Sequence, residues 1–356
     1  MASSSQSGGA GGPKSVGWIG LGSMGSAMAK NVQKHLTTAG KDQPPLRVYN
    51  RTASRCAALE ELGAKKYESI AELARDSDIV FISSSADDAV ISIVDQIVQS
   101  GDVEGKVVVD TTTVHPDTTR AVAATLKSKG AHFAAMPVFG ATPVAEAGQL
   151  LAGFAGPDAA LGAVSPLLKG VIAREVLVVG QEPEKASLLK TTGDGETNRE
   201  LEPAHGVVDA DHRRSARFRR QDGTAGSYPG APTGAQLWAR DALGLNPHDD
   251  RRLLPGPDQK PWSDLQLAIK DVGHGVEIAE REGVSLHVGQ RALGNLKKAN
   301  EWRESAEGGG GRSLDSSSVF GVVRQESGLG FETEFVKARD DVAATAEPES
   351  NNRPTK

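Results

Sequence analysis

The six residues at positions 20–25, Gly-Leu-Gly-Ser-Met-Gly, constrain the fold more than any other part of the chain. An apolar run, Val-Gly-Trp-Ile, precedes them directly, and a segment with apolar residues at helical spacing follows. A GxGxxG motif between a strand and a helix predicts the turn of a βαβ unit, in which glycines let the backbone approach a pyrophosphate at the helix N-terminus. The alternative is a glycine-rich turn without function. We expect a dinucleotide to contact Gly20, Leu21, Gly22, Ser23, Met24 and Gly25.

Beyond the glycine motif, short apolar runs alternate with helical patterns as far as Gly180, which is typical of parallel βαβ units. Strands are expected at LRVYNRT, SDIVFISSS, KVVVDTTT and HFAAMPV, with GQLLAGFAG and EVLVVG closing the sheet. The predicted fold is a doubly wound Rossmann α/β domain at residues 14–180, followed by an all-α domain at 181–340. Residues 1–13 and 341–356 are expected to be disordered tails.

An anomalous stretch, residues 194–254, interrupts the predicted helical domain. It holds no Ile, Met or Lys but nine Arg and three His, and shows no sustained period. A nucleic-acid patch at DHRRSARFRR is one interpretation, and a disordered insertion is another. We favour translation out of frame. Reading each codon from its second base permits Lys-Thr-Gly-Leu at residues 221–224, and over the stretch it recovers the aliphatic and aromatic residues that a helical domain needs. Genomic and transcript sequencing decides between these interpretations.

The overall composition favours small molecules or proteins as partners. A formal net charge of −6 gives no general attraction to nucleic acid or anionic membranes. The lone Cys56 excludes an internal disulfide framework and a cysteine-rich zinc site, and no residues fall at metal-ligand spacing. No apolar run approaches the roughly 20 residues of a membrane helix, and the N-terminal residues resemble neither a secretory signal nor a transit peptide. A cytoplasmic location is expected.

The end of the second predicted strand carries Asn50, Arg51 and Thr52, where an NAD enzyme usually offers an acidic residue to the ribose. A carboxylate there repels a 2′-phosphate, whereas a guanidinium and a hydroxyl bind it. The sequence therefore predicts NADP as the cofactor, with NAD as the alternative. The other interpretation of Arg51 is a solvated charge at the end of a strand.

Four segments together resemble one enzyme family: GWIGLGSMGSAMAKN, VYNRT, VVDTTTVHP and KDVGHGVEIAEREGV. They are similar to the β-hydroxyacid dehydrogenases, relatives of 3-hydroxyisobutyrate dehydrogenase and 6-phosphogluconate dehydrogenase. The resemblance covers Ser15 to about Thr192 and resumes near Pro255. It implies an NADP-dependent oxidoreductase that transfers hydride between nicotinamide and the hydroxyl or carbonyl of a small hydroxyacid or aldehyde.

The resemblance also implies binding residues. Cofactor contacts would come from Ser84, Ser85, Thr113 and Lys270. The segment MPVFGATPVAEAG is similar to the family's substrate-binding segment, which places Phe139, Gly140 and Ala141 at the substrate. The family has Ser where this chain has Phe139, so an apolar ring replaces a hydroxyl that contacts substrate. A different or larger substrate is expected.

By its place after Gly180, Lys190 matches the family's catalytic lysine, which donates or accepts the proton while the cofactor transfers hydride. Lys185 competes for this role. The family has Asn four residues after its lysine, and this chain has Asp194. His274 is interpreted as a surface or packing residue.

Two alternatives to a hydroxyacid dehydrogenase remain. One is imine reduction on the same fold with a changed proton donor. The other is an NADP-binding interaction protein that has lost catalysis because residues 194–254 replace a helix of the domain interface. A homodimer is expected if the helical domain is intact.

Overall fold

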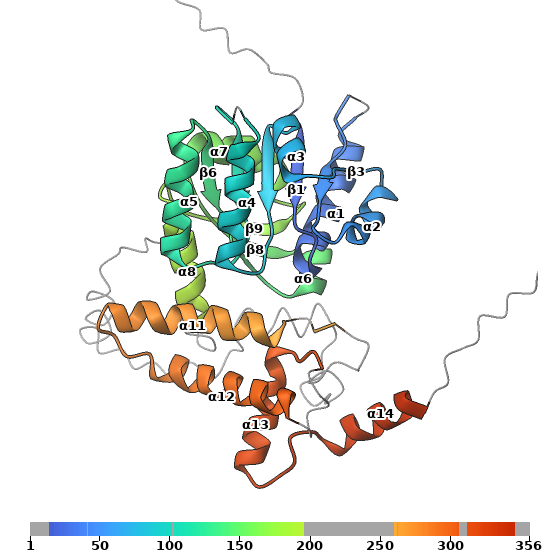
Figure 1. Ribbon diagram of the computed structural model, residues 1–356, viewed down its shortest axis with the longest axis vertical. Helices are drawn as coiled ribbons and strands as arrows, with labels where there is room; N and C mark the ends of the chain where they lie inside the picture. The colour runs from blue at the N-terminus through green and yellow to red at the C-terminus, as the bar shows by residue number, and fades with distance from the viewer. Residues whose placement is uncertain are drawn as a thin grey trace, which may run out of the picture. The chain divides into compact units, whose positions relative to one another are not determined.

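The computed structural model describes residues 14–40, 42–101, 103–195, 260–261, 263–305 and 312–345 (Figure 1). This part of the chain forms two compact units, the first ending at Thr192 and the second containing the segments from Lys260 onward. Apart from its first two residues, the stretch 194–254 lies outside the described residues, so the frameshift and insertion hypotheses stay predictions.

The first unit is built on a single mixed sheet. Its strands are β1 (Val16–Ile19), β2 (Arg47–Tyr49), β3 (Lys65–Lys66), β4 (Ile79–Ile82), β5 (Val107–Asp110), β6 (His132–Ala135), β7 (Val138–Phe139), β8 (Leu150–Ala155) and β9 (Ala173–Gly180). The order β3-β2-β1-β4-β5-β6 is parallel throughout and reverses at β1, as in a doubly wound sheet. β8 then pairs antiparallel with β6 and β7, and parallel with β9. The predicted Rossmann class is confirmed.

Helices cover both faces of this sheet. They are α1 (Ser23–Thr38), η1 (Ala53–Cys56), α2 (Ala57–Glu60), α3 (Ile70–Asp76), α4 (Asp87–Gln99), α5 (Pro116–Ser128), α6 (Thr142–Glu146), α7 (Asp158–Val164), η2 (Ser165–Leu167) and α8 (Glu184–Gly195). One core joins Trp18 and Phe81 to α1, α2 and α7, and the other joins Val80 and Ile82 to α3, α4 and α5. Adjacent residues of β4 enter opposite cores because side chains alternate along a strand.

Two strands were not predicted as separate strands, although Val138 of β7 ends the predicted strand HFAAMPV, and one predicted helix is short. β3 and β7 have two residues each, and Lys65–Lys66 form a strand because they pair with Arg47 and Val48. The segment SRCAALEELG begins as a 3-10 turn and continues as α2 for only one turn, since its apolar spacing buries just Cys56 and Leu59.

The described residues of the second unit are helical, as expected. Its elements are α11 (Leu265–Arg281), α12 (His287–Glu304), η4 (Ser316–Ser318), α13 (Val319–Glu326) and α14 (Glu334–Thr345). Its core contains the stacked rings of Trp302 and Phe331, whose centroids are 3.8 Å apart. Because α14 extends to Thr345, the boundary expected at residue 341 for the C-terminal tail is placed at least five residues too early.

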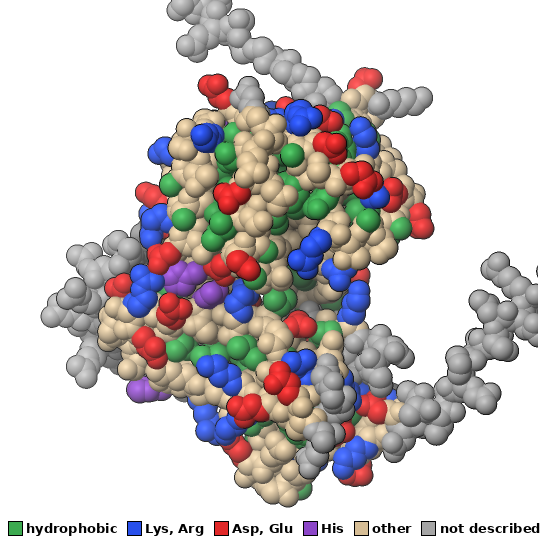
Figure 2. All heavy atoms as spheres, in the orientation of Figure 1, with side chains coloured by type: hydrophobic (Ala, Val, Ile, Leu, Met, Phe, Trp, Pro, Cys, Tyr) green, Lys and Arg blue, Asp and Glu red, His purple; other side chains and the backbone are tan. Residues whose placement is uncertain are grey.

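Charged side chains of both signs are interspersed on the face shown in Figure 2, without a continuous basic patch. This distribution agrees with the net charge of −6. Among the described residues, no helix has the length and apolarity that a membrane crossing needs.

Candidate functional site

The carboxyl ends of β1, β4 and β5 meet at one edge of the parallel sheet. The loops that follow them carry the glycine motif, Ser83 to Ser85, and Thr111 to Thr113. In open α/β sheets, ligands bind in the crevice beyond these strand ends, next to the point where the strand order reverses. The order reverses at β1, so the glycine loop lies at that position.

The glycine loop leaves backbone space where a phosphate is expected. Gly20 has φ of +96°, and a Cβ there would lie 2.0 Å from the Ser83 carbonyl oxygen. A Cβ at Gly25 would lie 2.3 Å from the Gly20 carbonyl oxygen, so this glycine lets α1 approach the turn. Gly22, the N-cap of α1, has nothing within 4 Å of such a Cβ. An open N-terminus bordered by two close backbone approaches suits a pyrophosphate.

The end of β2 is tied to this loop by Asn50. Its Oδ1 accepts a hydrogen bond from the Leu21 amide at 2.8 Å, and its Nδ2 donates to the Thr52 carbonyl at 3.0 Å. Asn50 therefore shapes the loop, a role that the sequence reasoning did not assign to it. Arg51 and Thr52 are exposed beside it.

The loops after β4 and β5 are joined by hydrogen bonds. The Ser84 amide donates to the Thr112 hydroxyl at 2.9 Å, and the Thr111 hydroxyl donates to the Ile82 carbonyl at 2.8 Å. Ser84 and Thr113 are half-buried, while Ser85 is exposed. The expected contact residues Ser84 and Thr113 thus lie on two adjoining loops at the same sheet edge.

The expected substrate segment forms β7 and the start of α6. Phe139 pairs with Leu151 of β8, and its ring lies beneath the Lys190 ammonium, 4.6 Å from Nζ to the ring centroid. Gly140 follows with φ of +133°, and Ala141 is the N-cap of α6. The structure therefore brings Lys190 and the Phe139 segment together.

The same segment adjoins the glycine loop. The Thr142 hydroxyl lies 3.8 Å from the Met24 sulfur, and the side-chain Nδ2 of Asn31 in α1 donates to the Ala145 carbonyl at 2.8 Å. Through α6, the residues expected at the substrate and those expected at the cofactor belong to one continuous packed region of the first unit.

Two other lysines are placed differently. Lys185 forms an ion pair with Glu182 at 3.0 Å on the outside of α8. Lys270 lies in α11 of the second unit and is paired with Asp271 at 2.6 Å, and His274 follows it by one turn. Lys270's expected contact with the cofactor stays a prediction.

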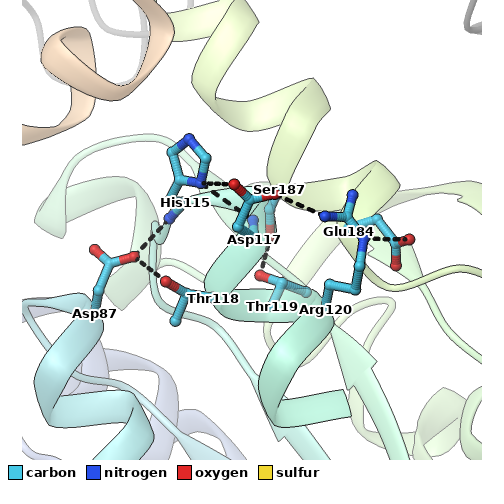
Figure 3. Close-up of polar contacts among 8 residues, drawn as sticks. All are labelled: Asp87, His115, Asp117, Thr118, Thr119, Arg120, Glu184 and Ser187. Atoms are coloured by element: carbon cyan, nitrogen blue, oxygen red, sulfur yellow. Dashed lines mark hydrogen bonds and ion pairs between the residues drawn. The ribbon is translucent and has the colours of Figure 1, made fainter. Parts of the chain in front are cut away.

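Polar contacts among α4, α5 and α8, beside the site, were missed by the sequence reasoning (Figure 3). Asp87, at the start of α4, accepts hydrogen bonds from the His115 amide and the Thr118 hydroxyl at 2.8 and 2.7 Å. Thr119 and Ser187 share a hydroxyl–hydroxyl bond of 2.7 Å. The signal that points to Asp87 is the acidic pair 87–88 at a helix start, where carboxylates are favoured.

Other chemistries find no support in the described ranges. No group of three or more His, Cys, Asp or Glu side chains is placed there to hold a metal ion. Cys56 is buried, and burial raises the pKa of its thiol, which disfavours the nucleophilic thiolate.

Comparison with known proteins bears on this geometry. Residues 15–180 match the model of the NAD binding domain of 6-phosphogluconate dehydrogenase. The match covers the first unit as far as Gly180. The expectation of a nicotinamide dinucleotide cofactor is thereby confirmed, and both NAD and NADP agree with it.

Two curated relatives extend the comparison. The NADH-dependent oxidoreductase ucdB of Aspergillus ustus is 28% identical over 87% of this chain and 99% of its own length. The mitochondrial 3-hydroxyisobutyrate dehydrogenase of Drosophila melanogaster is 32% identical over 45% of this chain, and that match spans about half of the fly enzyme, 47%. The resemblance to β-hydroxyacid dehydrogenases is confirmed, and the chain is related to NAD(P)-dependent oxidoreductases.

A solved structure shows the same fold. A 3-hydroxyisobutyrate dehydrogenase from Salmonella typhimurium superposes with a TM-score of 0.60 and 19% identity, covering 87% of this chain and 99% of that one. At this identity the likeness concerns the fold, a Rossmann-like sheet followed by a helical region.

Proposed function

We propose that this protein is an NADP-dependent oxidoreductase that transfers hydride between nicotinamide and the hydroxyl or carbonyl of a small hydroxyacid or aldehyde. The observation that carries the proposal is the position of Lys190. Its ammonium lies over Phe139, in a segment that packs against the glycine loop. An ammonium at such a place can hold or deliver the proton that accompanies hydride transfer.

The chain's own residues would hold the cofactor by its phosphates and ribose. The open N-terminus of α1 at Gly22 suits the pyrophosphate, and the exposed Arg51 and Thr52 suit a 2′-phosphate. Ser84 and Thr113 lie in adjoining loops at the same sheet edge. When bound, the nicotinamide supplies or accepts the hydride. The named relative ucdB uses NADH, so NADH belongs beside NADPH in every assay.

The role of Lys190 is to stabilise negative charge on the substrate oxygen and to exchange a proton with it. The aromatic face of Phe139 holds the ammonium by a cation–π contact until a substrate oxygen takes its place. Leu189 and Phe139 both lie near Gly153 of β8, so the floor beneath the ammonium is apolar. We propose that such a floor suits a substrate with an apolar or larger group beside its carbonyl.

The test is consumption of NADPH or NADH by the full chain with a panel of aldehydes, ketoacids and imines. Lys190→Ala is expected to lower kcat by about 100-fold or more, the usual range for losing a general acid. Lys185→Ala, on the same helix and paired with Glu182, is the matched control and should keep wild-type turnover. Loss of turnover in Lys185→Ala but not in Lys190→Ala would transfer the role to Lys185.

A second candidate is cofactor binding without turnover. It is favoured by Asp194, which stands one turn past Lys190 on α8 where the family has Asn. In that case the chain binds NADPH but reduces no substrate of the panel. Turnover of an imine and of no carbonyl would instead support the imine reductase alternative.

A further inference from the structure

We propose that Thr119 and Ser187 are positioning residues that fix the catalytic helix α8 relative to the loop of Thr113, which is expected to contact the cofactor. The proposal rests on the role given above to Lys190. It assigns a purpose to the polar contacts of Figure 3, which lie beside the site and not in it.

The two hydroxyls form a buried contact between helices. Thr119 of α5 is fully buried and Ser187 of α8 is 2% exposed, and their oxygens are 2.7 Å apart. A buried hydroxyl that loses its hydrogen-bond partner destabilises the fold. Any arrangement of the two helices that separates these hydroxyls is therefore disfavoured. A contact of this kind specifies one rotation of α8 about its axis, which packing of small apolar side chains alone does not.

Ser187 stands three residues before Lys190, which is close to one helical turn. In the same turn, the Thr191 hydroxyl donates to the Ser187 carbonyl at 2.9 Å, and Ala186 lies in the core. Fixing the rotation at Ser187 therefore fixes the direction in which the Lys190 side chain leaves the helix.

A separate set of contacts holds the loop after β5. Asp87 accepts from the His115 amide and from the Thr118 hydroxyl, which anchors the first turn of α5 to α4. His115 is the N-cap of α5, and Thr113 lies two residues before it. Helix α5 is thus attached to α4 through Asp87 at its first turn and to α8 through the bond between Thr119 and Ser187.

The outer contact between the same helices contributes less. Arg120 reaches Glu184 at 3.4 Å, and its side chain is 60% exposed. Exposed ion pairs contribute little and are screened by salt. The buried pair of Thr119 and Ser187 is therefore the contact to test.

The experiment uses the full chain and a substrate that it turns over. Thr119→Val and Ser187→Ala are expected to lower kcat by about 10- to 100-fold, the effect of misplacing a reacting group by about 1 Å, while KM for NADPH changes by less than about 2-fold. Thr119→Ser keeps the hydroxyl and should restore kcat to within about 3-fold of wild type. Thr125→Val, an exposed position on the same helix, is the matched control and should leave kcat unchanged.

The outcomes separate this proposal from the one it rests on. If Lys190→Ala abolishes turnover while Thr119→Val and Ser187→Ala keep wild-type kcat, the positioning role is refuted and the catalytic role stands. If Lys190→Ala keeps turnover, the catalytic role fails, and the positioning role fails with it. A parallel loss of kcat and NADPH binding in Thr119→Val, without rescue in Thr119→Ser, would show a general folding defect and refute the proposal.

Discussion

Alanine at Gly22 and at Gly25 should separate cofactor binding from stability, although the two glycines are only three residues apart. At Gly22, φ is −67° and a Cβ meets no atom within 4 Å, so the folded protein accepts alanine without strain. That Cβ would instead occupy the space expected for the pyrophosphate. Loss of one charge-assisted hydrogen bond costs about 1.5–3 kcal/mol, which raises the Kd for NADPH by about 10- to 150-fold.

At Gly25, the added Cβ would lie 2.3 Å from the Gly20 carbonyl oxygen and 2.9 Å from the Ser83 hydroxyl. The first of these is backbone, so α1 must shift. Overpacking of this kind costs about 1–3 kcal/mol, or about 2–12 °C in Tm for a domain of this size.

The assays are NADPH fluorescence titration and thermal unfolding, both with wild type as reference. Gly22→Ala should keep the wild-type Tm and lose affinity, and Gly25→Ala should lose Tm. Wild-type affinity in Gly22→Ala would refute the phosphate role of this loop. An equal fall in Tm for both variants would refute the claim that the folded protein has room for a Cβ at Gly22 but not at Gly25.

Three further changes test other parts of the account. Arg51→Asp places a carboxylate beside the expected 2′-phosphate, so the Kd for NADPH should rise by about 10-fold or more while that for NADH does not, which parallel titrations measure. Phe139→Ser should raise kcat/KM for small hydroxyacids with a free carboxylate relative to bulkier carbonyl compounds, and an unchanged ratio in the substrate panel would contradict the role of the ring. Burial raises the pKa of Asp78, but hydrogen bonds from the Ser15 hydroxyl and amide and the charge of Lys106 outweigh it and lower the pKa below its usual value. The stability that this carboxylate contributes is therefore present above about pH 4 and is lost as the pH falls through the lowered pKa. In urea unfolding, Asp78→Asn should lower the free energy of unfolding by about 0.5–1 kcal/mol at pH 7 and by less at pH 3. A loss that grows on acidification would contradict this role of Asp78.

Local signals in the sequence were sufficient for the glycine loop and the parallel strands. Gly20 and Gly25 are required because backbone atoms approach them closely at the turn between a strand and a helix. The spacing of these glycines can be read from the sequence alone. The two-residue strands β3 and β7 were not predictable as separate strands, because Lys65 and Phe139 are in strands only through their pairing partners.

Contacts between distant residues explain what the sequence reasoning missed at the site. Lys190 and Phe139 were each selected, but their stacking joins residues from separate elements and has no local signal. Thr119 and Ser187 are 68 residues apart. The one hint is that Thr119 shares a helical face with Val122 and Leu126, where a hydroxyl among apolar residues needs a partner.

The most direct test of the account is titration of the full chain with NADPH and NADH, followed by intrinsic and cofactor fluorescence. The account predicts a saturable change with both cofactors and a lower Kd for NADPH. No change with either cofactor, under conditions in which the first unit is folded, would contradict the central claim that this chain binds a nicotinamide dinucleotide at its glycine loop.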